Sequence, residues 1–159
     1  MDSETGYGAE NSRMGEEAMD LHGYYFEDLV VGQIAGFAKT ITEADIVLFS
    51  GVCGDTNPMH INEEYASQTI FKGRIAHGML LAGLISTVLG TKLPGPGCVY
   101  VTQNLRFRAP VKIGDTAMAK VELTELVPEK KRANFKTTVS VGSLVVIDGD
   151  ASLLVPSRP

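Results

Sequence analysis

The chain has 159 residues, a length at which one domain buries about two thirds of the surface that the unfolded chain would expose. Apolar residues make up 44% and charged residues 21% of it, which is typical of a globular protein and excludes a largely disordered, collagen-like or filamentous chain. The two cysteines, Cys53 and Cys98, lack CxxC spacing and are too few for a disulfide framework. We therefore expect reduced thiols and a cytoplasmic protein.

The net charge of −5 is carried by the N-terminal segment. Residues 1–22 contain six acidic residues and one arginine, so the remaining 137 residues are neutral overall. A neutral body lacks the basic face that nucleic-acid binding requires, and we expect no nucleic-acid partner. The segment is rich in Gly, Ser and Glu and has no apolar run like that of a secretory signal. It is predicted to be a disordered extension, 1–22, ahead of a single domain over 23–159.

The first part of the body predicts one strand followed by helices. A short strand is expected over 34–40. Thr42 can cap a helix that begins after it, because its hydroxyl can accept a hydrogen bond from a backbone N–H of the first turn. Gly51 and Gly54 are expected to end this helix, and a second, short helix is predicted over 63–66.

The longest stretch without Asp, Glu, Lys or Arg covers residues 75–91. It contains His77 and Ser86 and is shorter than the roughly 20 apolar residues that span a bilayer, so we expect no membrane partner. Residues 79–89 place apolar side chains on all sides at helical spacing. They predict a buried helix that ends at Gly90 and is wrapped by other elements.

From Cys98 onward the pattern changes to an alternation of period two, rich in β-branched residues. The strands that this alternation predicts cover residues 99–107, 117–127, 133–141 and 144–155. Short connections between consecutive strands favour antiparallel pairing. One apolar helix and a run of antiparallel strands predict an α+β fold in which a curved sheet wraps around a central helix.

Asp55 and His60 stand five residues apart in a loop that contains Asn57 and Pro58. A carboxylate and an imidazole that converge on one water can orient it, remove its proton and return a proton elsewhere. The alternative interpretation is structural, because residues 55–58 form a good turn by themselves and His60 could simply pack beside it. The spacing alone does not decide between them.

His77 and Gly78 precede the predicted buried helix. Backbone N–H groups at a helix start have no partner within the helix, and a glycine allows a ligand to approach them closely, so a thioester oxygen could be stabilised there. Alternatively, Gly78 is a small residue at a crowded junction and His77 a core or capping histidine. Ser86 lies in the apolar helix and either bonds a backbone carbonyl one turn earlier or faces a polar ligand.

The run from Gly54 to His60, GDTNPMH, resembles the hydratase 2 motif of MaoC-like dehydratases. Residues 75–82 and 93–97 also resemble this family, particularly its short (R)-specific enoyl-CoA hydratases. The resemblance implies a hot-dog fold, a homodimer and an acyl-CoA substrate. The implied reaction is the reversible addition of water to a trans-2-enoyl-CoA, giving an (R)-3-hydroxyacyl-CoA, and it requires no metal or other cofactor.

The resemblance also implies roles for individual residues. Asp55 and His60 match the catalytic pair of the family, and Gly78 matches its oxyanion-hole glycine. Ser86 matches a polar active-site serine on the central helix, and Asn57 matches an asparagine of the motif that we interpret as structural.

Three alternatives remain open at this point. Asp55, His60 and His77, with Cys53 nearby, could form a metal site of two histidines and one carboxylate. The fold could instead carry thioester hydrolysis, because one fold supports several chemistries. The chain could also be a binding subunit that holds acyl thioesters without catalysis.

Overall fold

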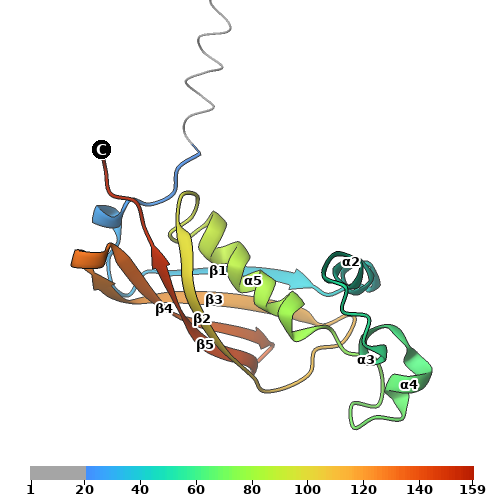
Figure 1. The fold of residues 1–159 in the computed structure, drawn as a ribbon. Coiled ribbons are helices and arrows are strands. Elements are labelled where there is room, and N and C mark those ends of the chain that lie inside the picture. The colour runs from blue at the N-terminus through green and yellow to red at the C-terminus, as the bar shows by residue number, and fades with distance from the viewer. Residues whose placement is uncertain (1–20) are drawn as a thin grey trace, which may run out of the picture.

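The computed structural model describes residues 21–159 (Figure 1). The helices and strands in chain order are η1 (Phe26–Asp28), β1 (Ile34–Thr40), α2 (Glu43–Cys53), α3 (Pro58–Ile61), α4 (Glu63–Ser67), α5 (Gly78–Thr91), β2 (Val99–Phe107), β3 (Thr116–Val127), η2 (Pro128–Lys130), β4 (Arg132–Val141) and β5 (Leu144–Leu154). Most of the predicted extension, residues 1–20, lies outside the described residues.

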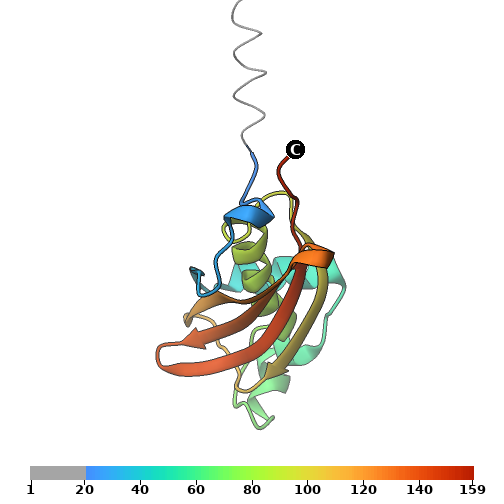
Figure 2. The same cartoon turned by 90° about the vertical axis from the view of Figure 1, so that its left-hand side faces the viewer.

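The five strands form one antiparallel sheet in the order β1-β3-β4-β5-β2, so β1 and β2 are its edges. α5 lies along one face of this curved sheet, and α2, α3 and α4 gather beyond one end of it (Figures 1 and 2). The first described residues and the C-terminus lie at the opposite end (Figure 1). The predicted α+β architecture, a curved antiparallel sheet with a central helix, is confirmed.

Alternation along the strands builds the core, as the sequence predicts. In β3 every second side chain over the first eight residues is buried, and its neighbours point to the other face. The buried residues of this strand are Ala117, Ala119, Val121 and Leu123. They belong to the same hydrophobic cluster as the buried side of α5. The predicted bounds of the four later strands agree with the structure to within one residue.

α5 packs against the sheet through one side. Its buried residues recur at helical spacing and are Leu81, Leu84, Ile85, Val88 and Leu89. The prediction that Gly90 ends the helix is wrong, since the helix continues through it to Thr91. Full wrapping is not found either, because Gly83, Ser86 and Gly90 on the other side are exposed. No helix among the described residues is long and apolar enough to cross a bilayer.

α2 begins with the cap that the sequence predicts. The Thr42 hydroxyl accepts the backbone N–H of Asp45, and the Asp45 carboxylate accepts the backbone N–H of Thr42 at 2.9 Å. The prediction that Gly51 helps to end the helix is wrong, because the helix continues through the exposed Gly51 to Cys53, and a glycine inside a helix costs only about 1 kcal/mol. Gly54 does end it, in the left-handed conformation with φ of 80°, which favours glycine.

The turn expected over 55–58 leads directly into a helix that the sequence analysis did not predict. Asn57 caps α3, since its side-chain oxygen accepts the backbone N–H of Met59 at 3.1 Å. Pro58 occupies the first helical position, where proline is tolerated because the N–H that it lacks would have no partner in the helix. The short helix predicted over 63–66 is confirmed as α4.

Candidate active site

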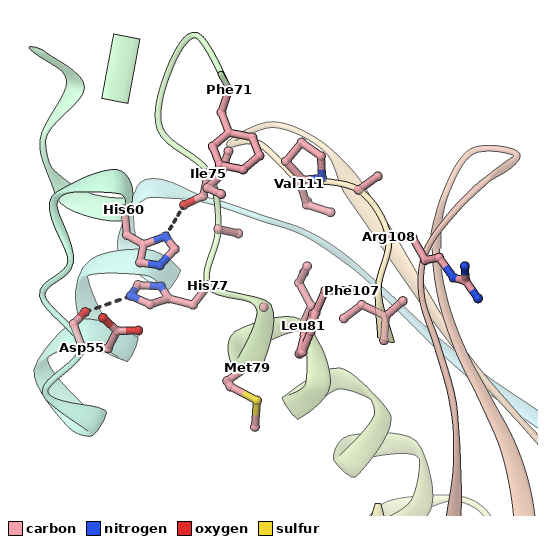
Figure 3. Close-up of a pocket in the computed structure, with 15 residues that line it drawn as sticks. Asp55, His60, Phe71, Ile75, His77, Met79, Leu81, Phe107, Arg108 and Val111 are labelled. Carbon is pink, nitrogen blue, oxygen red and sulfur yellow. Dashed lines mark hydrogen bonds between the residues drawn. The ribbon is translucent and has the colours of Figure 1, made fainter. Parts of the chain in front are cut away.

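A cavity of about 420 Å³ opens where α3, the start of α5 and the end of β2 meet (Figure 3). Most of its lining is apolar. The apolar residues that line it are Phe71, Ile75, Ala76, Met79, Leu81, Phe107, Ala109, Pro110, Val111 and Ile147. The polar side chains of Asp55, His60 and His77 gather at one end, and Arg108 lies on the other side (Figure 3). The cavity therefore combines an apolar wall with one cluster of acid–base groups.

His60, on α3, is held through both its ring and its backbone. Its Nδ1 lies 2.8 Å from the carbonyl oxygen of Ile75. A carbonyl only accepts, so Nδ1 donates and the neutral ring keeps the lone pair on Nε2. The Arg74 side chain donates from Nε to the carbonyl oxygen of His60 at 2.6 Å and pairs with Glu43 through both terminal nitrogens at 2.9 Å. The orientation of His60 is thus fixed with Nε2 left available.

Asp55 directly follows the left-handed Gly54 that ends α2. One of its carboxylate oxygens accepts the backbone N–H of Asn57 at 3.2 Å, and its own N–H points to the sulfur of Cys53 at 3.4 Å. The residue is exposed, and its carboxylate forms no salt bridge with any residue in 21–159. It can therefore accept further hydrogen bonds.

The structure brings Asp55, His60 and His77 together. One side-chain nitrogen or oxygen of each lies within 4.8 Å of those of the other two. The rings of the two histidines lie close together, with centroids 3.8 Å apart and planes tilted by 30°. A metal ion binds an imidazole through a free lone pair in the ring plane, and one nitrogen of each ring is already occupied, since His77 Nε2 donates to the Asp55 carbonyl oxygen and His60 Nδ1 donates to that of Ile75. The geometry therefore favours acid–base chemistry over the alternative of a shared metal ion.

Gly78 is the first residue of α5 and follows His77, whose backbone is extended with ψ of 133°. Its N–H forms no hydrogen bond with another described residue. A Cβ at this position would lie 2.6 Å from Cε1 of Phe107, which is too close for van der Waals contact. The glycine therefore stands at a crowded junction, as one interpretation expects, and its N–H is free among the described residues, as the other requires.

Ser86 is not part of this cavity in the single chain. It lies eight residues after Gly78, which is about 12 Å along the helix axis, and it is exposed. Burial raises the pKa of Tyr100 on β2 to about 12, and a hydrogen bond with the Ser86 hydroxyl acts against that rise. Of the predicted site residues, the structure thus groups Asp55, His60 and Gly78 and places Ser86 apart, beside Tyr100.

Sequence reasoning missed several groups that shape this site. The carbonyl oxygen that orients His60 belongs to Ile75, and a backbone group carries no signal in the sequence. Phe71 and Phe107 line the cavity from a loop and from the end of a strand. Their residue type indicates burial but not position, so only the assembled fold identifies them.

Comparisons with known proteins agree with this arrangement. The profile of the MaoC like domain matches residues 31–146. The chain is 60% identical over 141 residues to the (R)-specific enoyl-CoA hydratase of Rhodospirillum rubrum, covering 89% of this chain and 98% of that protein. It is 52% identical over 139 residues to the 3-hydroxybutyryl-CoA dehydratase of Methylorubrum extorquens, covering 87% and 88%.

Solved structures show the same similarity. The unliganded R-hydratase PhaJ1 of Pseudomonas aeruginosa has a TM-score of 0.80 at 43% identity, covering 86% of this chain and 88% of that one. The (R)-hydratase of A. caviae involved in PHA biosynthesis has a TM-score of 0.79 at 38% identity, covering 82% and 99%. The resemblance seen in the motif from Gly54 to His60 is thereby confirmed, and the chain belongs to the MaoC-like dehydratase family.

Proposed function

We propose that this protein is an (R)-specific enoyl-CoA hydratase. It adds water reversibly to a trans-2-enoyl-CoA and forms an (R)-3-hydroxyacyl-CoA, which makes it a hydro-lyase. The observation that carries the proposal is the proximity of the Asp55 carboxylate to the His60 imidazole, whose Nε2 is left available, at one end of an apolar cavity. Three similar proteins are named as an (R)-specific enoyl-CoA hydratase, a 3-hydroxybutyryl-CoA dehydratase and an R-hydratase. These names support the same reaction.

Asp55 and His60 act on one water molecule. The carboxylate and the lone pair of Nε2 each accept one hydrogen bond from it, which directs its oxygen at C3 of the enoyl chain. As the new C–O bond forms, the pair removes one proton from the water and supplies a proton to C2. The hydrogen bond from Nδ1 to Ile75 supports this role, because it keeps the accepting nitrogen pointed into the cavity.

Gly78 stabilises the charge that the attack creates. Addition at C3 pushes an electron pair through the conjugated system onto the thioester oxygen, giving an enolate. The N–H of Gly78 has no partner among residues 21–159 and lies at the positive end of α5, so it can donate to that oxygen. The enolate then collapses, C2 takes up the proton and the hydroxyl remains on C3.

The apolar wall of the cavity suits the acyl chain of the substrate. Phe71 and Val111 contribute to this wall, whereas Asp55, His60 and His77 supply polar side chains at the reacting end. An apolar chain would be removed from water there, and the thioester would meet α5 at its first residue. This division between wall and reacting end supports an acyl thioester as the substrate.

We infer that the protein acts as a homodimer. β2 is an edge strand whose residues Val99, Tyr100 and Val101 are exposed, and unpaired apolar edges favour pairing with a second chain. The exposed side of α5 beside it carries Gly83 and Gly90, which allow another helix to approach closely. Light scattering should report twice the chain mass of 17.0 kDa, or a multiple of it. A stable, active monomer would contradict this inference.

We also infer a cytoplasmic location. Cys53 and Cys98 are free thiols, which suits a reducing compartment. Fractionation of the source cells followed by detection of the chain tests this, and recovery from an oxidising compartment would contradict it.

The test of the reaction is direct. Purified protein with crotonyl-CoA should lose the absorbance of the enoyl thioester, and chiral analysis of the product should give the (R) isomer. A product of (S) configuration, or release of free CoA without hydration, would overturn the proposal. Release of CoA would instead indicate thioester hydrolysis.

A further inference from the structure

His77 is the most buried polar group at the site, with 1% of its surface exposed. Its Nε2 lies 3.0 Å from the backbone carbonyl oxygen of Asp55 and 3.2 Å from the hydroxyl oxygen of Ser50. Its Nδ1 is buried and has no hydrogen-bond partner within residues 21–159. All polar contacts of this side chain therefore pass through one nitrogen.

The direction of these hydrogen bonds follows from the groups involved. A backbone carbonyl only accepts, so Nε2 of His77 must carry the hydrogen and donate to Asp55. This bond joins His77, which directly precedes α5, to the loop that follows α2, and the two residues are 22 positions apart in sequence. It fixes the backbone of Asp55, whose own N–H has only a weak acceptor in the sulfur of Cys53.

The ring of His77 also supports the other member of the pair. It lies against the ring of His60 (Figure 3), with centroids 3.8 Å apart and planes tilted by 30°. Phe49 of α2 packs against the His77 ring at a centroid distance of 4.9 Å. His60 is thus held in its plane by the Ile75 carbonyl and against movement across that plane by His77. One buried side chain touches both groups that act on the water.

We propose that His77 is a positioning residue for the hydration reaction. Its Nε2–H holds the backbone of Asp55 and its ring backs His60, so that both acceptors meet the same water. The inference rests on the proposed function and adds a role for a residue that does not itself transfer a proton. Misplacement of a catalytic group by about 1 Å can cost about 10²-fold in rate, so this support is worth testing in turnover.

The matched variants are His77→Gln and His77→Asn. The amide nitrogen of glutamine can occupy the place of Nε2 and donate to Asp55, whereas that of asparagine is one bond shorter and cannot reach it. Neither variant keeps the aromatic ring, so their comparison isolates the donor. His77→Phe gives the complement, because it keeps an aromatic ring against His60 and removes the donor. Ser50→Ala removes the other partner of Nε2 and leaves the bond to Asp55 in place.

We measure kcat and KM for crotonyl-CoA in all four variants, with circular dichroism as a check of folding. His77→Asn and His77→Phe should lose about 10²-fold in kcat with little change in KM. His77→Gln should recover about tenfold or more of that loss, and Ser50→Ala should stay within about threefold of the unchanged protein.

Equal losses in the folded Gln and Asn variants would overturn the donor role, and so would full activity in His77→Phe. A loss that appears in KM alone would also overturn the proposal, because positioning of the pair acts on turnover. If either His77→Asn or His77→Phe does not fold, the other, which also lacks the donor, is compared with His77→Gln. Failure of the proposed function is distinguishable, since the unchanged protein would then not hydrate crotonyl-CoA at all.

Discussion

At one end of the sheet the charged residues form ion pairs within the protein, whereas at the other end Asp55 and His60 form none with a described residue. At the end where the described chain begins and finishes, charges are paired within the protein. Glu27 accepts from the side chain of Lys131 and from the backbone N–H of Arg158, and Asp28 pairs with the Arg158 guanidinium. These contacts join η1, the turn after η2 and the C-terminus. Pairing of this kind fixes one arrangement of the chain.

At the other end, beside α3 and α5, the two groups proposed to act on the water, Asp55 and His60, form no ion pair with another described residue. His60 uses one ring nitrogen and keeps the other available. Arg74, which pairs with Glu43, holds the backbone of His60 rather than its ring, and Arg108 on the other side of the cavity pairs with Asp148. Ion pairs within the protein stabilise the fold, whereas catalysis needs acid–base groups that stay unpaired until substrate and water bind.

The largest expected effect comes from substituting Asp55 or His60. Asp55→Asn and His60→Gln are close in size to the original residues, so each should fold normally and lose about 10²-fold or more in kcat for crotonyl-CoA. The double variant should lose much less than the product of the two losses, because both residues act on one water. Near-normal hydration by either single variant, measured with a chelator present, would contradict the assignment.

The next effect concerns the donor at the start of α5. Alanine and proline at position 78 both add a Cβ that meets Phe107, and only proline removes the N–H. The pair is therefore compared in a Phe107→Leu background, which relieves the contact. The backbone of His77 is extended, as a residue before proline requires. Gly78→Pro should lose about 10²- to 10³-fold more kcat than Gly78→Ala.

Equal kcat in the two folded variants would assign the oxyanion role to another donor. In the unaltered background, Gly78→Ala alone should also lose activity, because the Phe107 ring has to move. Recovery of that activity when Phe107→Leu is added would show that the contact with the Phe107 ring caused the loss.

A smaller effect is expected from substituting Glu27, at the end of the sheet where charges are paired. It should appear in stability rather than in turnover. The backbone N–H of Arg158 is the main cause that lowers the pKa of Glu27 from 4.5 to about 2. A lowered pKa means that the ionised group stabilises the folded state above about pH 4.5, and that this contribution is lost as the pH falls toward 2. Glu27→Gln should lower Tm by a few degrees at most at pH 7.

The difference in Tm between this variant and the unchanged protein should shrink as the pH approaches 2, with kcat at pH 7 the same in both. A constant difference across the pH range would show that the charge of Glu27 is not its cause. A loss of kcat would show that the two ends are coupled.

The smallest effect is expected for removal of residues 1–20, the acidic segment that the sequence predicts to be disordered. Truncation should stop there, because the His22 ring stacks on Tyr25 at a centroid distance of 4.0 Å and belongs to the paired end. Melting temperature and hydratase rate should stay nearly unchanged while the isoelectric point rises from about 5.2. A large fall in the rate would show that the segment contributes to the site.

The sequence by itself determined the local features of this protein. Period-two alternation placed the strands to within about one residue, since each inward side chain must be apolar for the sheet to bury one face. The Thr42 cap and the left-handed Gly54 could be predicted because both depend on neighbours within a few residues. The motif from Gly54 to His60 is local, so the family could be predicted from it, and so could the proximity of Asp55 to His60.

Only the tertiary structure decided the contacts that make this pair usable. The Ile75 carbonyl orients His60, His77 reaches back to Asp55, and Phe107 crowds Gly78 from a strand 29 residues away. The helix ends expected at Gly51 and Gly90 were wrong, because a glycine inside a helix costs only about 1 kcal/mol and does not by itself end it. Such contacts join residues that are distant in sequence, and their geometry depends on how the whole sheet curves around α5.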